Sequence, residues 1–193
     1  MRNQTARLLA AIFLLATSST AYAHPGHVVS GLAAGLMHPF SGLDHLLAMV
    51  AVGFWAAQGG GRKVWLLPAT FMIMLAVGAG AATLWQSLPM LESGLAVSVL
   101  ALGLLVALSL QLPASLSVAI TALFGLLHGY AHGLDLPESA APAAYAFGFL
   151  AATLTLHLSG IAVGVATRKR YALLAKMMGV TIATCGAWML TTS

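Results

Sequence analysis

Apolar runs of about twenty residues follow one another along this sequence, separated by short breaks rich in glycine, proline and polar residues. A helix of about twenty residues is long enough to cross the ~30 Å hydrocarbon core of a membrane. The pattern therefore predicts an all-α integral membrane protein with six transmembrane helices. The predicted spans cover about residues 39–57, 64–85, 92–110, 114–133, 141–166 and 172–190.

The N-terminus has the pattern of a secretory signal peptide at residues 1–23. Arg2 and Arg7 precede a short apolar run, and Ala21-Tyr22-Ala23 has the form of a cleavage site. Cleavage there would leave residues 24–193 as a single six-span membrane domain whose N-terminus is exported. An uncleaved first span is the alternative interpretation, and the short apolar core and the cleavage site both disfavour it.

The first apolar run of the mature chain extends from Val28 to Ala57, which is too long for one perpendicular span. Pro39 interrupts it, and proline removes a backbone donor and restrains the residue before it. The sequence therefore predicts a short outer half-helix at 28–37, a break at His38-Pro39, and a first full span that begins at Pro39.

Composition and charge define the class and the orientation. With 60% hydrophobic and only 6% charged residues, the chain has too few charges to cover a soluble surface. The few basic residues lie in short clusters beside apolar runs, which gives no case for nucleic-acid binding. Arg62, Lys63, Lys176 and the 168–170 cluster fall at one face, which the positive-inside rule makes cytoplasmic. We expect a protein of the bacterial inner membrane with both mature termini in the periplasm.

The stretch from Met37 to Met49, MHPFSGLDHLLAM, contains the first candidate site. It places His38, Asp44 and His45 within apolar sequence. An ionised carboxylate costs a few kcal/mol inside a membrane, so Asp44 is a functional candidate by default. Asp44 could either bind a cation or fix the tautomer of a neighbouring imidazole.

His128 and His132 on the fourth span form the second candidate motif, because an i,i+4 pair can grip one ion. The direction of each span places them with His38, Asp44 and His45 in the outer half of the membrane. Imidazole and carboxylate together suit Ni²⁺, Co²⁺ or Zn²⁺. The alternative is that each histidine only makes a hydrogen bond across a helix interface.

Three further histidines are weaker candidates. His157 lies deeper, on the fifth span, and is either a second station for the ion or a structural hydrogen-bonding residue. His24 and His27 could capture metal at the exported N-terminus, although a solvated linker is the simpler interpretation. Asp135, in the loop after the fourth span, is by default solvated and could also attract cations.

Glycines recur every fourth residue on the fourth span, at Gly125, Gly129 and Gly133, and on the fifth span, at Gly160 and Gly164. Such rows let helices pack closely. The row on the fourth span neighbours His128 and His132, so close packing would press these imidazoles towards another helix.

These residues resemble the motifs of the HupE/UreJ family. The resemblance rests on His24-Pro25-Gly26-His27, on the segment from His38 to His45, on the segment from His128 to Gly133, and on Leu156-His157. It covers nearly the whole mature chain. The first motif is more distantly similar to the H-x4-D-H helix of nickel/cobalt permeases, with five residues here between His38 and Asp44. Family members often have an acidic residue soon after the second histidine motif, and this sequence departs from that pattern because its acidic residue, Asp135, stands two residues beyond Gly133.

The resemblance implies uptake of nickel, in some members cobalt, for hydrogenase or urease maturation. It implies that His38, Asp44 and His45 recognise the metal, with His128, His132 and His157 contributing. We therefore expect a permease and not an enzyme. Its transported substrate would be Ni²⁺ or Co²⁺, with no permanent cofactor and only an indirect link to the maturation proteins. The alternatives are a membrane-embedded zinc metalloenzyme and a non-transporting accessory subunit. The sequence leaves open the coupling mechanism and the oligomeric state, including a homo-oligomer.

Overall fold

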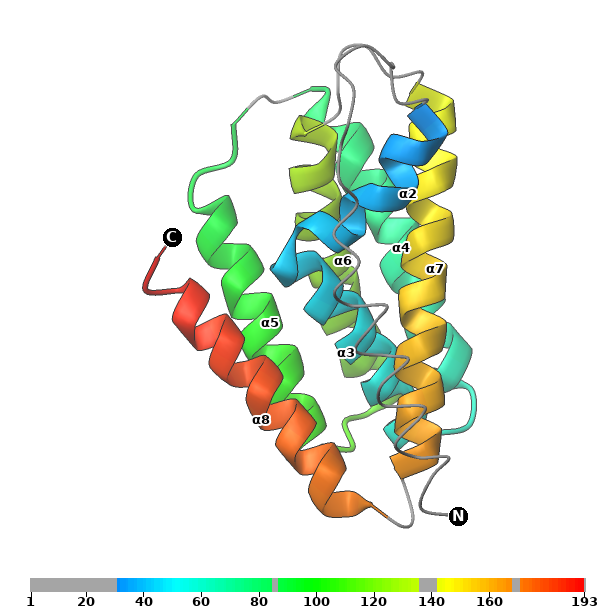
Figure 1. Ribbon diagram of the computed structural model, residues 1–193, viewed down its shortest axis with the longest axis vertical. Coiled ribbons are helices and arrows are strands. Elements are labelled where there is room, and N and C mark those ends of the chain that lie inside the picture. Colours follow the sequence, from blue (N-terminus) through cyan, green and yellow to red (C-terminus); the bar gives the residue numbers. More distant parts are fainter. Residues whose placement is uncertain (1–30, 85–86, 136–141, 168–170, 193) are drawn as a thin grey trace, which may run out of the picture.

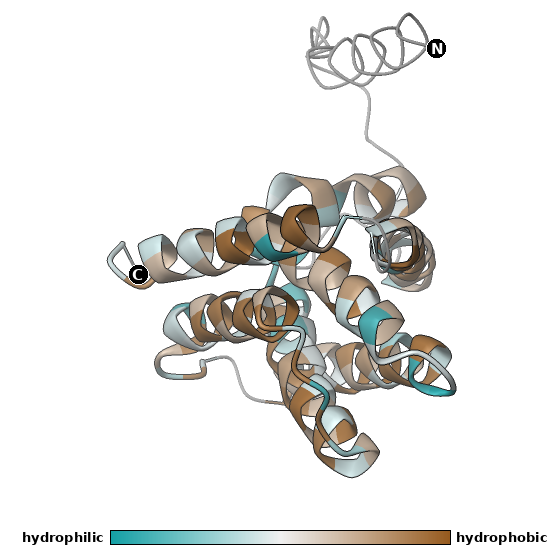
Figure 2. Cartoon of the chain, turned by 90° about the horizontal axis from the view of Figure 1, so that it is seen from below, coloured by the Kyte–Doolittle hydropathy of each residue, from teal (hydrophilic) through white to brown (hydrophobic). Residues whose placement is uncertain are grey.

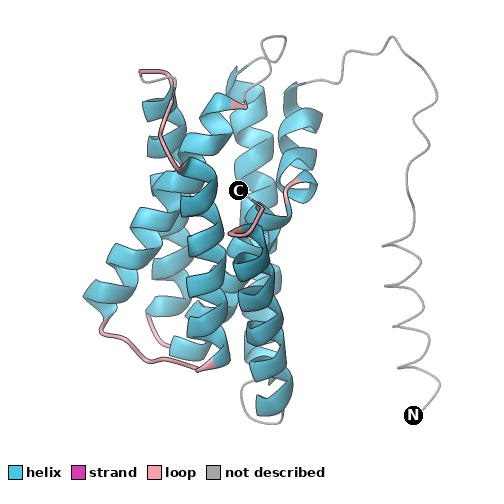
Figure 3. Ribbon diagram, turned by 90° about the vertical axis from the view of Figure 1, so that its left-hand side faces the viewer, coloured by secondary structure: helices cyan, strands magenta, loops and turns pink. Residues whose placement is uncertain are grey.

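The computed structural model describes residues 31–84, 87–135, 142–167 and 171–192, and in these ranges every regular element is a helix (Figure 3). The helices are α2 (Gly31–Ser41), α3 (Leu43–Gly59), α4 (Lys63–Ala82), α5 (Leu91–Ala107), α6 (Ala114–Leu134), α7 (Pro142–Thr167) and α8 (Ala172–Met189). The predicted all-α class is thus confirmed. The predicted signal peptide at 1–23, together with His24 and His27, lies outside the described residues.

The helices have the length and surface of membrane spans. Four of them, α4, α6, α7 and α8, are long and apolar enough to cross a bilayer, and the bent pair α2–α3 would be a fifth. The remaining apolar helix, α5, has 17 residues. Large apolar side chains, including Ile73 and Phe147, stand exposed on the outside of the bundle. Hydrophobic residues are spread over the helices of the bundle (Figure 2). An apolar exterior of this extent fits contact with lipid, so the protein is a helical membrane protein. Six spans remain a prediction.

The break in the first apolar run lies at Gly42 and not at Pro39. Helix α2 continues through Pro39 to Ser41, and α3 leaves it at an angle of 82°. Proline has no N–H to donate to the Gly35 carbonyl one turn earlier, yet α2 continues for two residues beyond Pro39. Ser41 Oγ donates to the His38 carbonyl at 2.6 Å in this last turn. Gly42 then takes an extended conformation, with φ −102° and ψ 119°, and caps α3.

The bundle is built from closely packed helix pairs, with α3 at its centre (Figure 1). Helix α4 lies along α6, α5 along α8, and α7 along both α2 and α3. Glycines permit these contacts: a Cβ on Gly129 would overlap the Leu75 carbonyl of α4, and one on Gly160 would overlap the Val50 carbonyl of α3. The backbones therefore touch directly, as the glycine rows predicted.

Charge separates the two ends of the bundle. The described acidic residues, Asp44, Glu92 and Asp135, stand near the α2–α3 bend, at the start of α5 and at the end of α6. Arg62 and Lys63 stand at the opposite end, in the link from α3 to α4. The end that carries the acidic residues also holds most of the candidate histidines.

Candidate metal site

Four imidazoles from three helices converge at the acidic end of the bundle. His38 comes from α2, His45 from α3, and His128 and His132 from α6. The ring centroid of His132 lies 4.7 Å from that of His38 and 3.9 Å from that of His45, and the His45 and His128 centroids are 4.9 Å apart. We call these four residues, with Asp44, the histidine cluster. The structure therefore brings together five residues that the sequence placed at one depth.

Local structure positions each member. His128 and His132 share one face of α6 because they are four residues apart. Asp44 stands in the first turn of α3, where the positive end of the helix dipole favours a carboxylate. Its Oδ1 lies 2.7 Å from His45 Nδ1. His38 precedes Gly42 in the chain, on α2. The 82° bend between α2 and α3 brings its ring into contact with the ring of His132.

Several ring nitrogens of the cluster are buried without a hydrogen-bond partner among the described residues. They are both nitrogens of His132, Nδ1 of His128 and Nε2 of His45. A buried polar atom left unpaired costs about 1–3 kcal/mol. The alternative interpretation was that each histidine makes a hydrogen bond across a helix interface. Among the described residues of the cluster this holds only for His128, whose Nε2 lies 2.7 Å from Ser98 Oγ. Neutral imidazole nitrogens with open lone pairs are what a divalent transition metal requires.

The described side chains are not already arranged as a metal-binding set. No group of three or more His, Cys, Asp or Glu residues within the described ranges has the geometry to hold an ion. The rings instead meet edge to face, at interplanar angles of 70–79° for the three histidine pairs. Binding an ion would require them to turn.

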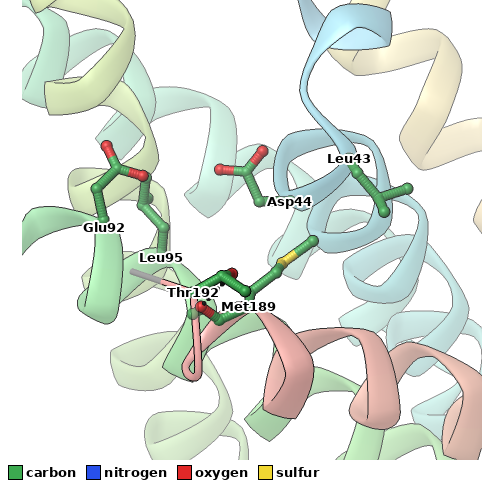
Figure 4. A pocket seen from close by; sticks show the side chains of 7 residues that line it. Leu43, Asp44, Glu92, Leu95, Met189 and Thr192 are labelled. Carbon is green, nitrogen blue, oxygen red and sulfur yellow. Dashed lines mark hydrogen bonds between the residues drawn. The ribbon is translucent and has the colours of Figure 1, made fainter.

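An acidic pocket of about 230 Å³ leads to the cluster. Its polar lining consists of His38, Ser41, Asp44, His45, Glu92 and Asp135. A neighbouring pocket of about 220 Å³ shares Asp44 and Glu92, which face each other from α3 and α5 (Figure 4). Asp135 is exposed, as expected of a loop residue, and it also lines this pocket. Three carboxylates near one another lower the local potential and concentrate cations.

His157 is separate from the cluster. It lies on α7, is completely buried, and neither ring nitrogen has a partner among the described residues. The Phe71 ring stands between it and the cluster, with its centroid 5.3 Å from that of His157 and 5.8 Å from that of His128. The deeper position predicted for His157 is thus accompanied by an aromatic side chain that the sequence did not single out.

Two other polar residues at the site could not be identified from the sequence. Glu92 is a single acidic residue at the start of an apolar run, and its contact with the pocket depends on how α5 lies beside α3 and α6. Ser98 is one of two serines in the apolar helix α5, and it is completely buried and bonded to His128. Neither residue has a partner at helical spacing that would have pointed to the site.

Fold and site together define a helical membrane protein with a buried cluster of histidines and one carboxylate beneath an acidic pocket. The comparisons with known proteins give the family. The family model described as HupE / UreJ protein matches residues 12–189. The chain is 44% identical over 179 residues to Protein HupE of Rhizobium leguminosarum bv. viciae. The aligned region covers 91% of this chain and 93% of that protein. The chain belongs to the HupE/UreJ family. No solved structure matches it significantly.

Proposed function

We propose that this protein is an inner-membrane permease that admits Ni²⁺, or Co²⁺, from the periplasm to the cytoplasm. The observation that carries the proposal is the convergence of four imidazoles and Asp44 from three helices, with His45, His128 and His132 buried. Membership of the HupE/UreJ family supports it, because the family resemblance implies nickel or cobalt supply to hydrogenase or urease maturation. In this proposal the metal is cargo, and the chain is not an enzyme.

The chemistry of the donors suits this cargo. Imidazole nitrogen with carboxylate oxygen favours borderline divalent ions over Mg²⁺ or Cu⁺. Asp44 would offset part of the positive charge of an ion that has shed water. The carboxylates of Glu92 and Asp135 would draw cations into the acidic pocket before they reach the imidazoles.

The proposed path runs from the acidic pocket through the histidine cluster, past Phe71, to His157. The described side chains do not form a ready-made metal-binding set, which fits an ion that must leave as readily as it binds. The membrane potential supplies a driving force: an inside-negative potential is worth about 4.6 kcal/mol per 100 mV for a divalent ion, twice the single-charge value. The proposed orientation places the acidic pocket in the periplasm and Arg62 and Lys63 in the cytoplasm, in accord with the positive-inside rule.

The test is uptake of radioactive nickel, and separately of cobalt, by cells that lack their own importers. The native protein is compared with Asp44→Asn and His45→Ala at equal membrane abundance. Thr184→Ala is the control, because Thr184 is exposed on α8 and bonds only to the Val180 carbonyl of its own helix among the described contacts. We expect uptake by the native protein and the control, and little by the other two variants.

Two results would refute the proposal. If the native protein imports neither metal, transport is the wrong class of function. If Asp44→Asn and His45→Ala transport normally, the cluster does not handle the ion. Stoichiometric zinc that survives purification and chelation would favour the metalloenzyme alternative, because a permease must release its ion.

A further inference from the structure

Ser98 connects α5 to the histidine cluster through a short chain of hydrogen bonds. Its hydroxyl donates to the Leu95 carbonyl at 2.7 Å, and its Oγ also lies 2.7 Å from His128 Nε2. Ser98 and His128 are both completely buried. The other ring nitrogen of His128, Nδ1, has no partner among the described residues.

The hydroxyl has one proton, and its placement decides the tautomer of His128. With the proton directed at the Leu95 carbonyl, Oγ offers a lone pair to Nε2, so Nε2 must carry a hydrogen. The opposite arrangement would direct the proton at Nε2 and leave two oxygens 2.7 Å apart with no proton between them. It would also place an N–H on the buried Nδ1, which has no acceptor among the described residues.

We propose that Ser98 holds His128 in the Nε2–H tautomer and so makes Nδ1 the nitrogen that binds the transported cation. Ser98 is a positioning residue in this scheme, since it acts through the imidazole and does not touch the ion. Imidazoles that bind metals are commonly fixed in this way, by a hydrogen bond from the ring nitrogen that does not bind. The part that concerns the cation rests on the proposed function, whereas the tautomer does not.

Nuclear magnetic resonance of the full chain, with ¹⁵N-labelled imidazole rings and no metal, tests the tautomer directly. The protein is placed in lipid nanodiscs at a pH where the rings are neutral, and His128→Gln identifies the signals of His128. We expect the proton on Nε2 in the native protein and in Ser98→Thr, which keeps the hydroxyl. In Ser98→Ala we expect a redistribution towards the Nδ1–H form.

Ser117→Ala is the matched control. Ser117 is also completely buried, and its hydroxyl donates to a carbonyl of the preceding turn, Pro113 O, at 3.1 Å. The His128 signals should be the same in this variant as in the native protein. A proton on Nδ1 in the native protein would overturn the inference, and so would a His128 tautomer that does not respond to Ser98→Ala.

Transport gives the second readout. Loss of a hydrogen bond that orients a metal ligand costs about 10- to 100-fold in metal affinity. We therefore expect Ser98→Ala to raise the KM for nickel by about this factor with a smaller change in maximal rate, and Ser98→Thr to restore it. An unchanged KM in Ser98→Ala would overturn the role of Nδ1 in binding. A native protein that imports no nickel would instead refute the permease proposal, while the tautomer measurement, made without metal, would still decide the role of Ser98.

Discussion

The contact between α4 and α6 predicts opposite effects for two glycine-to-alanine changes. Gly129 lies on α6 where a Cβ would overlap the Leu75 carbonyl, its carbon and its Cα, all backbone atoms of α4. Gly80 lies near the end of α4, where a Cβ would meet nothing within 4 Å. Both are helical glycines, so alanine improves the helix propensity at both positions.

The magnitude follows from the balance of two terms. Alanine in place of a helical glycine gains up to about 1 kcal/mol. Overpacking costs about 1–3 kcal/mol, and the upper value applies at Gly129 because backbone atoms cannot rotate away as a side chain can. Gly129→Ala should therefore lose about 2 kcal/mol of the free energy of unfolding. At about 2–4 °C per kcal/mol for a chain of this size, its Tm should fall by about 4–8 °C.

Thermal unfolding of the purified variants in one detergent measures both changes. Gly80→Ala should keep the Tm of the native protein or raise it by up to about 4 °C. Gly129→Ala should lower it and also reduce nickel uptake, because it pushes α6, with His128 and His132, away from α4. Equal Tm values for the two variants would show that the α4–α6 backbones do not approach each other as described.

Three further outcomes are expected. Phe71→Ala should lower the Tm by about 6–20 °C, since truncating a completely buried Phe costs about 3–5 kcal/mol, whereas Ile73→Ala, exposed on the same helix, should change it little. Similar shifts in the two variants would contradict the buried position of Phe71. Gly42→Ala should fold but lose uptake, because its methyl would lie 2.8 Å from Asp44 Oδ1 and 3.1 Å from His45 Nδ1; normal uptake would show that this contact does not matter for transport. Initial uptake rates at constant membrane potential should fall below about pH 6, because protons compete with metal for imidazole, and a flat profile from pH 7.5 to 5 would exclude the histidines from the rate-limiting binding step.

The depth of the candidate residues could be predicted from the sequence, but most of their contacts could not. Each helical residue advances about 1.5 Å, so the direction of each span was enough to place His45, His128 and His132 at a common depth. Which helices are neighbours is not encoded in that periodicity. The role of Ser98 depends on α5 lying against α6, and a serine in an apolar run gives no sign of it.

The glycine rows were more informative than the proline. Gly129 could be predicted to lie at a close helix contact, because a residue without a side chain has few other uses on an apolar helix face. Pro39 suggested a break, yet the loss of one backbone hydrogen bond did not end α2, which continues to Ser41. The chain bends at Gly42, which has no Cβ to collide with the Asp44 carboxylate. The crowding that makes glycine necessary there exists only in the folded structure.

The displaced break changes how the first motif works. On one continuous helix, His38 and His45 would share a face but stand about 10 Å apart along the axis, at 1.5 Å per residue. In the structure both rings contact the ring of His132, with distances between ring centroids of 4.7 Å for His38 and 3.9 Å for His45. This is achieved because the 82° bend at Gly42 turns α2 nearly perpendicular to α3. The spacing of the motif therefore reflects the geometry of a bend between two helices, and the partner that completes it comes from α6, almost ninety residues further along the chain.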